Sequence, residues 1–469
     1  MDLLDPIDAL MLTAELLSSP MHVAALMILT PPPGENSRSY VAQLYEESLN
    51  AADQLDPRLR RRPHRGIETG LQWVWQEVGD VDIRRHFQRR TLPAGHGLDA
   101  LWQLVSDLHA LRLDRSAPLW MAYLIDGLPE GRFALYIKVH HIVVDGVAGL
   151  QMITDSLSTD PLRRHMPPFY ATTRPADRTT AKPRRAISGP RSTLRAIGAA
   201  AGAGVGLARG VLRAELAAAV GSLVSESVSI PFGAPHTRFN TKLGLFRSVA
   251  GTSIARARVR AIQDAVGVTA NDVVTTVVSG VLRAWLTANG ELPGRSLVAI
   301  CPVTVRERDA ASSAGHGNQF GLGLCTLGTD IDDPAERLAL VHSAMTNVKH
   351  QVTEQGPGAM LLVLAPAIGP TVLLPLLPFT SAVPPSYNLP ISNVPGPQQQ
   401  MYFNGAHVDE IYPVSVVYDG MALNVTTCSY GALIGVGYVA DRDVMADVGE
   451  LIPLTEQALS DLEAAVFGA

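Results

Sequence analysis

The sequence predicts a protein of mixed helices and strands divided over two lobes. Its 469 residues exceed what one hydrophobic core normally supports, so two domains are the first expectation. The hydrophobic fraction of 47% permits a sizeable core, and the charged fraction of 17% is low enough to leave some apolar surface. Segments that alternate like strands and segments with helical spacing occur in both halves of the chain, which indicates helices and sheets in each lobe.

The boundary between the lobes is predicted from a change in composition after Pro167. Between Arg163 and Arg195 there are nine Lys or Arg residues and one acid, with Pro, Thr and Ser interspersed, as in a linker. The Ala- and Gly-rich stretch over 194–228 then predicts one or two crossover helices. We therefore expect an N-terminal lobe over 1–167, a basic linker and crossover helix over 168–230, and a C-terminal lobe over 231–469.

The stretch Phe133–Gly146 carries the strongest candidate for chemistry. Its residues alternate as in a strand, which places His141 on the face of the large apolar side chains and His140 on the other face. We therefore expect His141 to point inward. A neutral imidazole kept away from water can take a proton from an alcohol and pass it to a leaving group. Asp145 and Gly146 are expected to close the strand with a turn, and Asp145 to brace that turn.

Two adjacent histidines can also be structural, or half of a metal site, because buried polar residues are often simply satisfied core groups. Here the pattern His-His-x-x-x-Asp-Gly is complete. It resembles the signature of CoA-dependent acyltransferases of the chloramphenicol acetyltransferase-like superfamily. Further segments, in the same order along nearly the whole chain, extend the resemblance to bacterial wax ester synthase/diacylglycerol acyltransferases: Ser116–Trp120, Ala270–Val274, Pro302–Arg306 and Ser392–Pro397.

This resemblance implies an α/β (α+β) fold of two chloramphenicol acetyltransferase-like lobes, each a mixed sheet covered by helices, with His141 midway along a channel between them. Acyl-CoA would enter from one side, and diacylglycerol or a long-chain alcohol from the other. His141 would take the hydroxyl proton, and the alkoxide would attack the thioester without a covalent acyl-enzyme. The chain has no Gly-x-Ser-x-Gly elbow, which agrees with direct transfer. Acyl-CoA is a co-substrate, and no metal or other cofactor is expected.

The resemblance also implies residues that bind the substrates. Glu15 would lie near the active site, although a solvated charge at a helix end is an alternative. Asn271 would point toward the acyl-transfer centre, although Asn271 and Asp272 also suit a plain helix cap. Ser392 and Asn393 lie in a proline-rich loop expected to be extended, where they could face a developing oxyanion. A strand at the loop end without chemistry is the competing interpretation.

Charge and hydropathy point to a lipid surface rather than a nucleic acid. The net charge of −6 argues against nucleic acid. Five arginines crowd between Pro57 and Arg65, and more follow to Arg90. Such runs usually form solvated faces, but a patch for CoA phosphates or an anionic membrane is the functional alternative. The segment Gly356–Val408 has no charged residue, and we favour the apolar wall and membrane-facing mouth of a lipid site over a buried helix pair.

We expect the protein in the cytoplasm, associated peripherally with the inner face of the membrane or with lipid droplets. The acidic start Met1–Asp5 lacks the pattern of a secretory signal, and no uninterrupted apolar run reaches the ~20 residues of a bilayer span. The three cysteines suit core positions in a reducing compartment. Two other functions remain open: a carrier-protein-dependent acyltransferase or condensation-type enzyme, and a non-catalytic lipid-binding protein.

Overall fold

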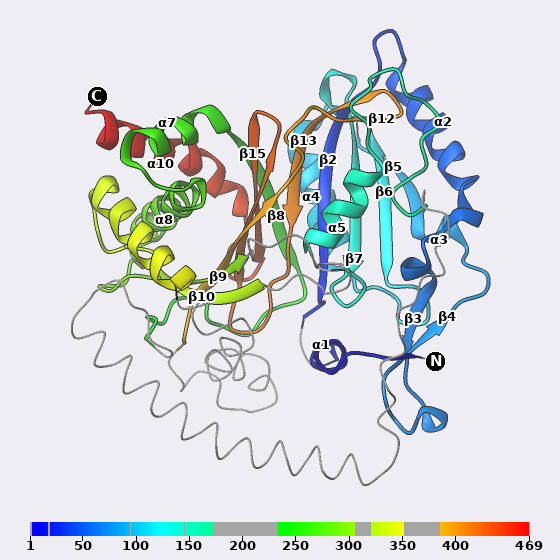
Figure 1. The fold of residues 1–469 in the computed structure, drawn as a ribbon, viewed down its shortest axis with the longest axis horizontal. Coiled ribbons are helices and arrows are strands. Elements are labelled where there is room, and N and C mark those ends of the chain that lie inside the picture. The colour runs from blue at the N-terminus through cyan, green and yellow to red at the C-terminus, as the bar shows by residue number, and fades with distance from the viewer. Residues whose placement is uncertain are drawn as a thin grey trace.

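Two six-stranded sheets lie side by side, one in each lobe, with helices on their outer faces and the helix Gly97–Ala110 (α4) between them (Figure 1). The structure is a computed structural model and describes residues 2–16, 19–93, 95–144, 146–171, 233–304, 320–350 and 385–468. Both large sheets mix parallel and antiparallel pairs. The prediction of two lobes built from mixed sheets and helices is therefore confirmed. Residues 172–232, which include most of the predicted linker and crossover helix, lie outside the described residues. Of the uncharged segment Gly356–Val408, residues 356–384 also lie outside them, whereas residues 385–408 contribute to the two large sheets.

The sheet of the N-terminal lobe has the strand order β12-β13-β2-β7-β6-β5, and a small sheet of order β1-β4-β3 lies beside it. The residues Leu119–Ile125 alternate as a strand, and the turn Asp126–Gly131 connects them to the strand that begins at Phe133. This pattern predicts a hairpin, which is present as the antiparallel pair β6 and β7. The strands of this lobe are β1 (Asp2–Leu3), β2 (His22–Thr30), β3 (Arg61–His64), β4 (Val74–Glu77), β5 (Phe87–Thr91), β6 (Trp120–Asp126), β7 (Phe133–His140), β12 (Tyr402–Phe403) and β13 (Ala406–Val414). Its helices are α1 (Pro6–Glu15), α2 (Ser37–Leu49), α3 (Ile83–His86), α4 (Gly97–Ala110) and α5 (Gly146–Asp155).

The sheet of the C-terminal lobe has the order β10-β9-β11-β14-β15-β8. Its strands are β8 (Arg247–Ala255), β9 (Val298–Thr304), β10 (Phe320–Thr326), β11 (Leu389–Pro395), β14 (Leu423–Tyr430) and β15 (Leu433–Asp441). Its helices are α7 (Arg256–Val266), α8 (Ala270–Ala288) and α10 (Leu451–Phe467), and residues 334–350 are also helical. Helix α7 begins at Arg256, directly where β8 ends at Ala255.

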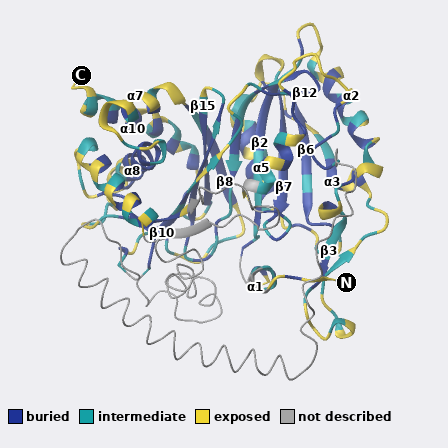
Figure 2. Ribbon diagram, in the orientation of Figure 1, coloured by how far each residue is buried: buried dark blue, intermediate teal, exposed yellow. Residues whose placement is uncertain are grey.

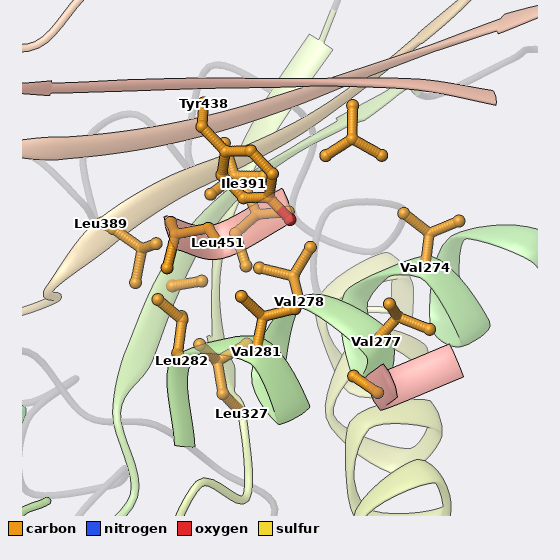
Figure 3. Close-up of a cluster of buried hydrophobic side chains, with 14 of the residues drawn as sticks. Val274, Val277, Val278, Val281, Leu282, Leu327, Leu389, Ile391, Tyr438 and Leu451 are labelled. Carbon is orange, nitrogen blue, oxygen red and sulfur yellow. The ribbon is translucent and has the colours of Figure 1, made fainter. Parts of the chain in front are cut away.

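The core of the C-terminal lobe forms around α8, whose apolar side chains recur at helical spacing and are almost fully buried. Figure 3 shows this side of the helix facing the sheet and α10. Burial of each such valine or leucine contributes about 1.5–3 kcal/mol. The contacting residues drawn there are Val274, Val277, Val278, Val281 and Leu282 of α8, with Leu327, Leu389, Ile391, Tyr438 and Leu451.

The start of α8 is capped as the sequence predicts. The Thr269 hydroxyl accepts from the Asp272 N–H, and the Asp272 carboxylate accepts from the Thr269 N–H, so each side chain satisfies the other residue's backbone. We expect Thr269→Ala to lower the free energy of unfolding by about 1 kcal/mol, measured by urea denaturation. Thr269→Ser keeps the hydroxyl and serves as the control. An equal loss of unfolding free energy in Thr269→Ala and Thr269→Ser would show that the capping hydroxyl does not stabilise the protein.

The two lobes interlock through β13, which joins the sheet of the N-terminal lobe although it lies late in the chain. It pairs with β2 on one side and crosses β15 of the other sheet closely. A side chain at Gly435 or Gly437 of β15 would collide with the carbonyl oxygens of Ile411 and Pro413, so only glycine permits this crossing. The division into 1–167 and 231–469 did not anticipate this exchange, and those boundaries remain predictions.

Helix α4 also joins the lobes, because it packs between the N-terminal sheet and β8. The Ser106 hydroxyl of α4 accepts from the Val249 N–H of β8 at 2.8 Å, and the Trp102 ring meets Tyr412 edge to face. Strand residues are buried and the outer helix faces exposed (Figure 2). Among the described residues no single helix is long and apolar enough to cross a bilayer, while α7 and α8, bent by 109°, reach that length and apolarity only as a pair.

Candidate active site

The histidine pair lies where β7 ends and a turn begins. The strand stops at His140, one residue before the end that the alternation predicted. The face on which the His141 imidazole lies stays a prediction. His141 still donates its N–H to the Met21 carbonyl, next to the paired His22 and His140, and Val143 donates to the His140 carbonyl in the turn, both at 2.9 Å. His140 is only 1% exposed, whereas His141 is half-buried.

Both ring nitrogens of His140 are committed to structural hydrogen bonds. Its Nδ1 lies 3.2 Å from the Ile142 N–H, which can only donate, so Nδ1 is the acceptor. In the neutral ring the proton is therefore on Nε2, which lies 3.3 Å from a carboxylate oxygen of Glu15. A ring held in this tautomer does not take a further proton without losing the Ile142 bond. His140 thus fixes the turn, and the candidate for proton transfer in the pair is His141.

Glu15, the last residue of α1, is buried to 4% exposure and is not the solvated helix-end charge that was the alternative. Its Oε1 accepts the Met21 N–H at 3.0 Å, and its Oε2 accepts from both Arg115 and His140. Burial alone would raise the pKa of this carboxyl. Hydrogen bonds from His140, Arg115 and the Met21 N–H outweigh burial and lower the pKa of Glu15 to about 2, so the carboxylate is ionised at neutral pH.

Two arginines that were not among the predicted site residues hold the Glu15 carboxylate and the end of α1 in place. Arg115 pairs with Glu15 and also donates to the Leu12 carbonyl at 2.9 Å, while Arg112 donates to the Glu15 carbonyl at 2.6 Å. These carbonyls belong to the last turn of α1 and have no partner within the helix. The available signal was the position of Arg115, directly before the Ser116–Trp120 segment.

Lys138 lies two residues before His140 on the same face of β7 and is almost fully buried. Its Nζ donates to the carbonyls of Leu108 and Leu111, each at 2.7 Å, and so caps the end of α4. His22, which pairs with His140 across the sheet, donates its Nε2 to the His109 carbonyl at 2.8 Å. Burial lowers the pKa of Lys138 to about 7 and holds the pKa of His22 well below its ordinary value.

The depressed pKa of Lys138 predicts an unusual pH dependence of stability. The ammonium loses its proton near pH 7 in the folded state but only near pH 10.5 when unfolded, so the unfolded chain binds the extra proton between these values. We therefore expect the melting temperature of the wild type, relative to Lys138→Met, to rise from pH 7 toward pH 10. Comparison with Lys138→Met removes the pH dependence that arises from titratable groups common to both proteins. A difference that stays constant over this range would contradict a buried, neutralised amine.

The structure locates the other predicted site residues but does not unite them all. Gly146 is exposed at the start of α5, and Asp145 lies outside the described residues. Asn271 is half-buried in the first turn of α8. The hydrogen-bond partners described for His140 are Glu15 and the Ile142 backbone, and not Asn271, Ser392 or Asn393. Their predicted binding roles remain predictions.

The segment with Ser392 and Asn393 is not a loop but strand β11, parallel to β14 and β9. Successive strand residues point to opposite faces of a sheet, so these two side chains do not both face one oxyanion. Asn393 accepts a hydrogen bond from the Thr427 hydroxyl at 3.2 Å. The prediction of a paired oxyanion loop is therefore wrong in its geometry.

Asp272, which caps α8, also lies 2.8 Å from the His342 ring, a partner that the sequence did not indicate.

Most arginines of the predicted basic patch already have partners. Ion pairs join Arg58 to Asp56 and Arg89 to Asp126, and Arg62 donates to Gln76 and to the Ser116 carbonyl. Such contacts favour a structural role for these side chains over a dedicated phosphate site. The three cysteines are buried, as expected for core residues.

Family models match both parts of the chain. The wax ester synthase/diacylglycerol acyltransferase catalytic domain matches residues 4–274, and the corresponding C-terminal domain matches residues 316–463. The chain is 38% identical over 464 residues to a Mycobacterium tuberculosis protein whose name is "putative diacylglycerol O-acyltransferase". The alignment covers 99% of this chain and 100% of that protein. A Mycobacterium bovis protein with the same kind of name is 36% identical, with 97% of this chain and 89% of that protein covered.

Solved structures give the same result at the level of the fold. The wax ester synthase/diacylglycerol acyltransferase from Marinobacter aquaeolei VT8 superposes with a TM-score of 0.78 at 30% identity, covering 100% of both chains. The starter condensation domain of rhizomide synthetase gives a TM-score of 0.54 at 14% identity, with 99% of this chain and 94% of that chain covered. The second similarity concerns the two-lobed fold alone.

Proposed function

This chain belongs to the wax ester synthase/diacylglycerol acyltransferase family, and from that membership we propose that it is an acyl-CoA-dependent O-acyltransferase that converts diacylglycerol to triacylglycerol. The M. tuberculosis relative, whose name assigns it this activity, matches over its full length. The observation that carries the proposal is the state of the histidine pair. His140 is locked by Ile142 and Glu15, which leaves His141, in the half-buried turn, to serve the reaction.

In the proposed reaction His141 acts as a general base toward the free hydroxyl of diacylglycerol. The alkoxide oxygen forms a bond to the thioester carbonyl carbon, and the resulting tetrahedral intermediate breaks the carbon–sulfur bond. The proton held by His141 then passes to the departing CoA thiolate. The residue Asp145 would brace the turn, a role that rests on the motif alone. Glu15 and Arg115 would keep His140, and with it the turn, in one position.

Fatty alcohols are proposed as second acceptors at the same site, which would yield wax esters. Acyl-CoA would be the only other molecule required, with no metal or prosthetic group. Since both acceptor and product are lipids, we propose that the enzyme is bound peripherally to a lipid surface. We propose a cytoplasmic enzyme at the inner face of the membrane or at lipid droplets. The binding roles of Asn271, Ser392 and Gly146 in this scheme are part of the proposal.

An acceptor panel with one long-chain acyl-CoA tests the function. We expect CoA thiol release with diolein, with formation of triacylglycerol, and a second, separate rate with hexadecanol. An acyl thioester bound to a carrier protein forms the comparison arm. Release only from the carrier-bound thioester would replace the proposal by a condensation-type enzyme, and no release from either donor would leave a lipid-binding protein.

A further inference from the structure

The tip of the β3–β4 hairpin displays large apolar side chains to solvent. Ile67 is 90% exposed and Leu71 is 59% exposed, and Leu3 of the adjoining β1 is 57% exposed. Leu71 also has a φ of 61°, in the left-handed region that leucine rarely adopts. A strained backbone that holds an apolar side chain in water is a reason to look for a function at the tip, Gly66–Gln72.

Tryptophan and arginine side chains lie directly behind the apolar tip. The Arg65 guanidinium lies over the Trp73 ring at 5.7 Å, and the Arg61 guanidinium over the Trp75 ring at 5.1 Å. Both indoles are only partly buried. The tip also carries Glu68, an exposed acid that pairs with His64. Aliphatic residues at a tip, with tryptophan and cationic side chains in the next layer, are typical of protein surfaces that lie at a lipid–water interface.

The hairpin is connected to the histidine turn by direct contacts. Trp73 donates its Nε1 to the Thr13 hydroxyl of α1 at 3.3 Å, and the Arg115 guanidinium that holds Glu15 lies 6.0 Å from the centre of the Trp73 ring. Trp73 and Trp75 pack with Ile142, the residue after the histidine pair, in one hydrophobic cluster. Figure 1 shows the hairpin and α1 at the same end of the molecule, and Figure 2 shows the tip exposed.

We propose that the tip Gly66–Gln72 inserts into an anionic lipid surface and so sets the histidine turn against the layer that holds the diacylglycerol. This inference rests on the proposed function and names the surface by which the enzyme reaches its lipid substrate. Arg65, directly before the tip, and Arg61 behind it supply charge complementary to acidic headgroups. The aliphatic side chains enter the acyl region, and the indoles remain at the headgroup level.

A fluorophore at the tip tests the insertion. All three native cysteines are buried, so Ile67→Cys offers a single accessible thiol for an environment-sensitive NBD label. Adding vesicles of phosphatidylcholine and phosphatidylglycerol should shift the NBD emission to the blue and increase it. Leu162→Cys, at a position 80% exposed in the loop that pairs with β12, is the matched control and should show no shift. An unchanged signal at position 67, while the protein sediments with the vesicles, would overturn the proposal.

Charge substitution provides an independent readout. The double variant Ile67→Asp/Leu71→Asp should bind these vesicles at least ~10-fold more weakly, while Leu162→Asp should bind like the wild type. Hydrolysis-corrected acyl transfer to a short-chain, water-soluble alcohol should be unchanged in both variants, which separates loss of docking from loss of chemistry. Full transfer activity with vesicle binding equal to the wild type in the double variant would refute the docking role and leave the proposed function intact. If the tip instead packs against a second copy of the chain, the wild type should be a dimer in solution and the double variant a monomer. That result would also refute the membrane-docking role.

Discussion

Replacement of His141 by alanine is expected to lower turnover by about 10²–10⁴-fold, the range by which a positioned general base accelerates proton transfer. The loss should appear in kcat with diolein and a saturating long-chain acyl-CoA. The fold should survive, because the His141 backbone bond to Met21 and the ring of His140 do not depend on the imidazole that is removed. The melting temperature should therefore stay close to that of the wild type.

A variant at the neighbouring position separates chemistry from architecture. His140→Ala removes the ring that joins Ile142 to Glu15, so we expect it to lower both the melting temperature and the rate. If His141→Ala retained the wild-type rate, or if His140→Ala abolished turnover in a protein of unchanged stability, the assignment of the base to His141 would be wrong.

Substitution of Glu15 by glutamine should destabilise the protein by roughly 3 kcal/mol, since it removes the counter-charge of a mostly buried guanidinium. This is the lower end for a buried pair, because the Arg115 side chain is still 25% exposed. Turnover should fall as well, because the turn that carries His141 loses the anchor of His140. The control is Asp264→Asn, which removes an exposed pair with Arg260 and should change stability by less than ~0.5 kcal/mol.

The same pair predicts a pH dependence with a defined sign. The pKa of Glu15 is depressed to about 2 in the folded protein, so its contribution to stability is complete above the unfolded value of 4.5 and is lost as the pH falls toward 2. The advantage of the wild type over Glu15→Gln in melting temperature should therefore shrink between pH 4.5 and pH 2. An advantage that is independent of pH would mean that the ionised carboxylate is not what stabilises α1 and the turn.

Local patterns predicted those parts of the fold that local physics decides. The β6–β7 hairpin follows from alternation and a turn, and the cap at Thr269 follows from side-chain hydrogen bonds within four residues. The segment with Pro390 and Pro395 was predicted as a loop but forms β11, because its pairing with β9 and β14 is decided by residues far away in the chain. The passage of β13 into the other lobe's sheet has the same non-local origin.

The candidate site shows the same limit. The motif around His140 and His141 is contiguous and could be found from the sequence. The pair of Glu15 and Arg115 joins residues 100 positions apart, so no spacing rule reveals it. The partners of the His140 ring, the Ile142 N–H in the turn and Glu15 in α1, do not follow from the alternation of the strand. Periodicity also continues the strand through His141, whereas the strand ends at His140.

Direct transfer of the acyl group to a lipid hydroxyl, with His141 as the base, requires that CoA is released only when an acceptor is present. The wild type is mixed with long-chain acyl-CoA alone, CoA thiol release and the intact protein mass are followed, and diolein is then added. We expect neither thiol release nor an acylated protein until diolein is added. After that, one triacylglycerol should form for each thiol released, at a rate that His141→Ala nearly eliminates. Acylated protein before the acceptor is added, or an equal rate in His141→Ala, would contradict it.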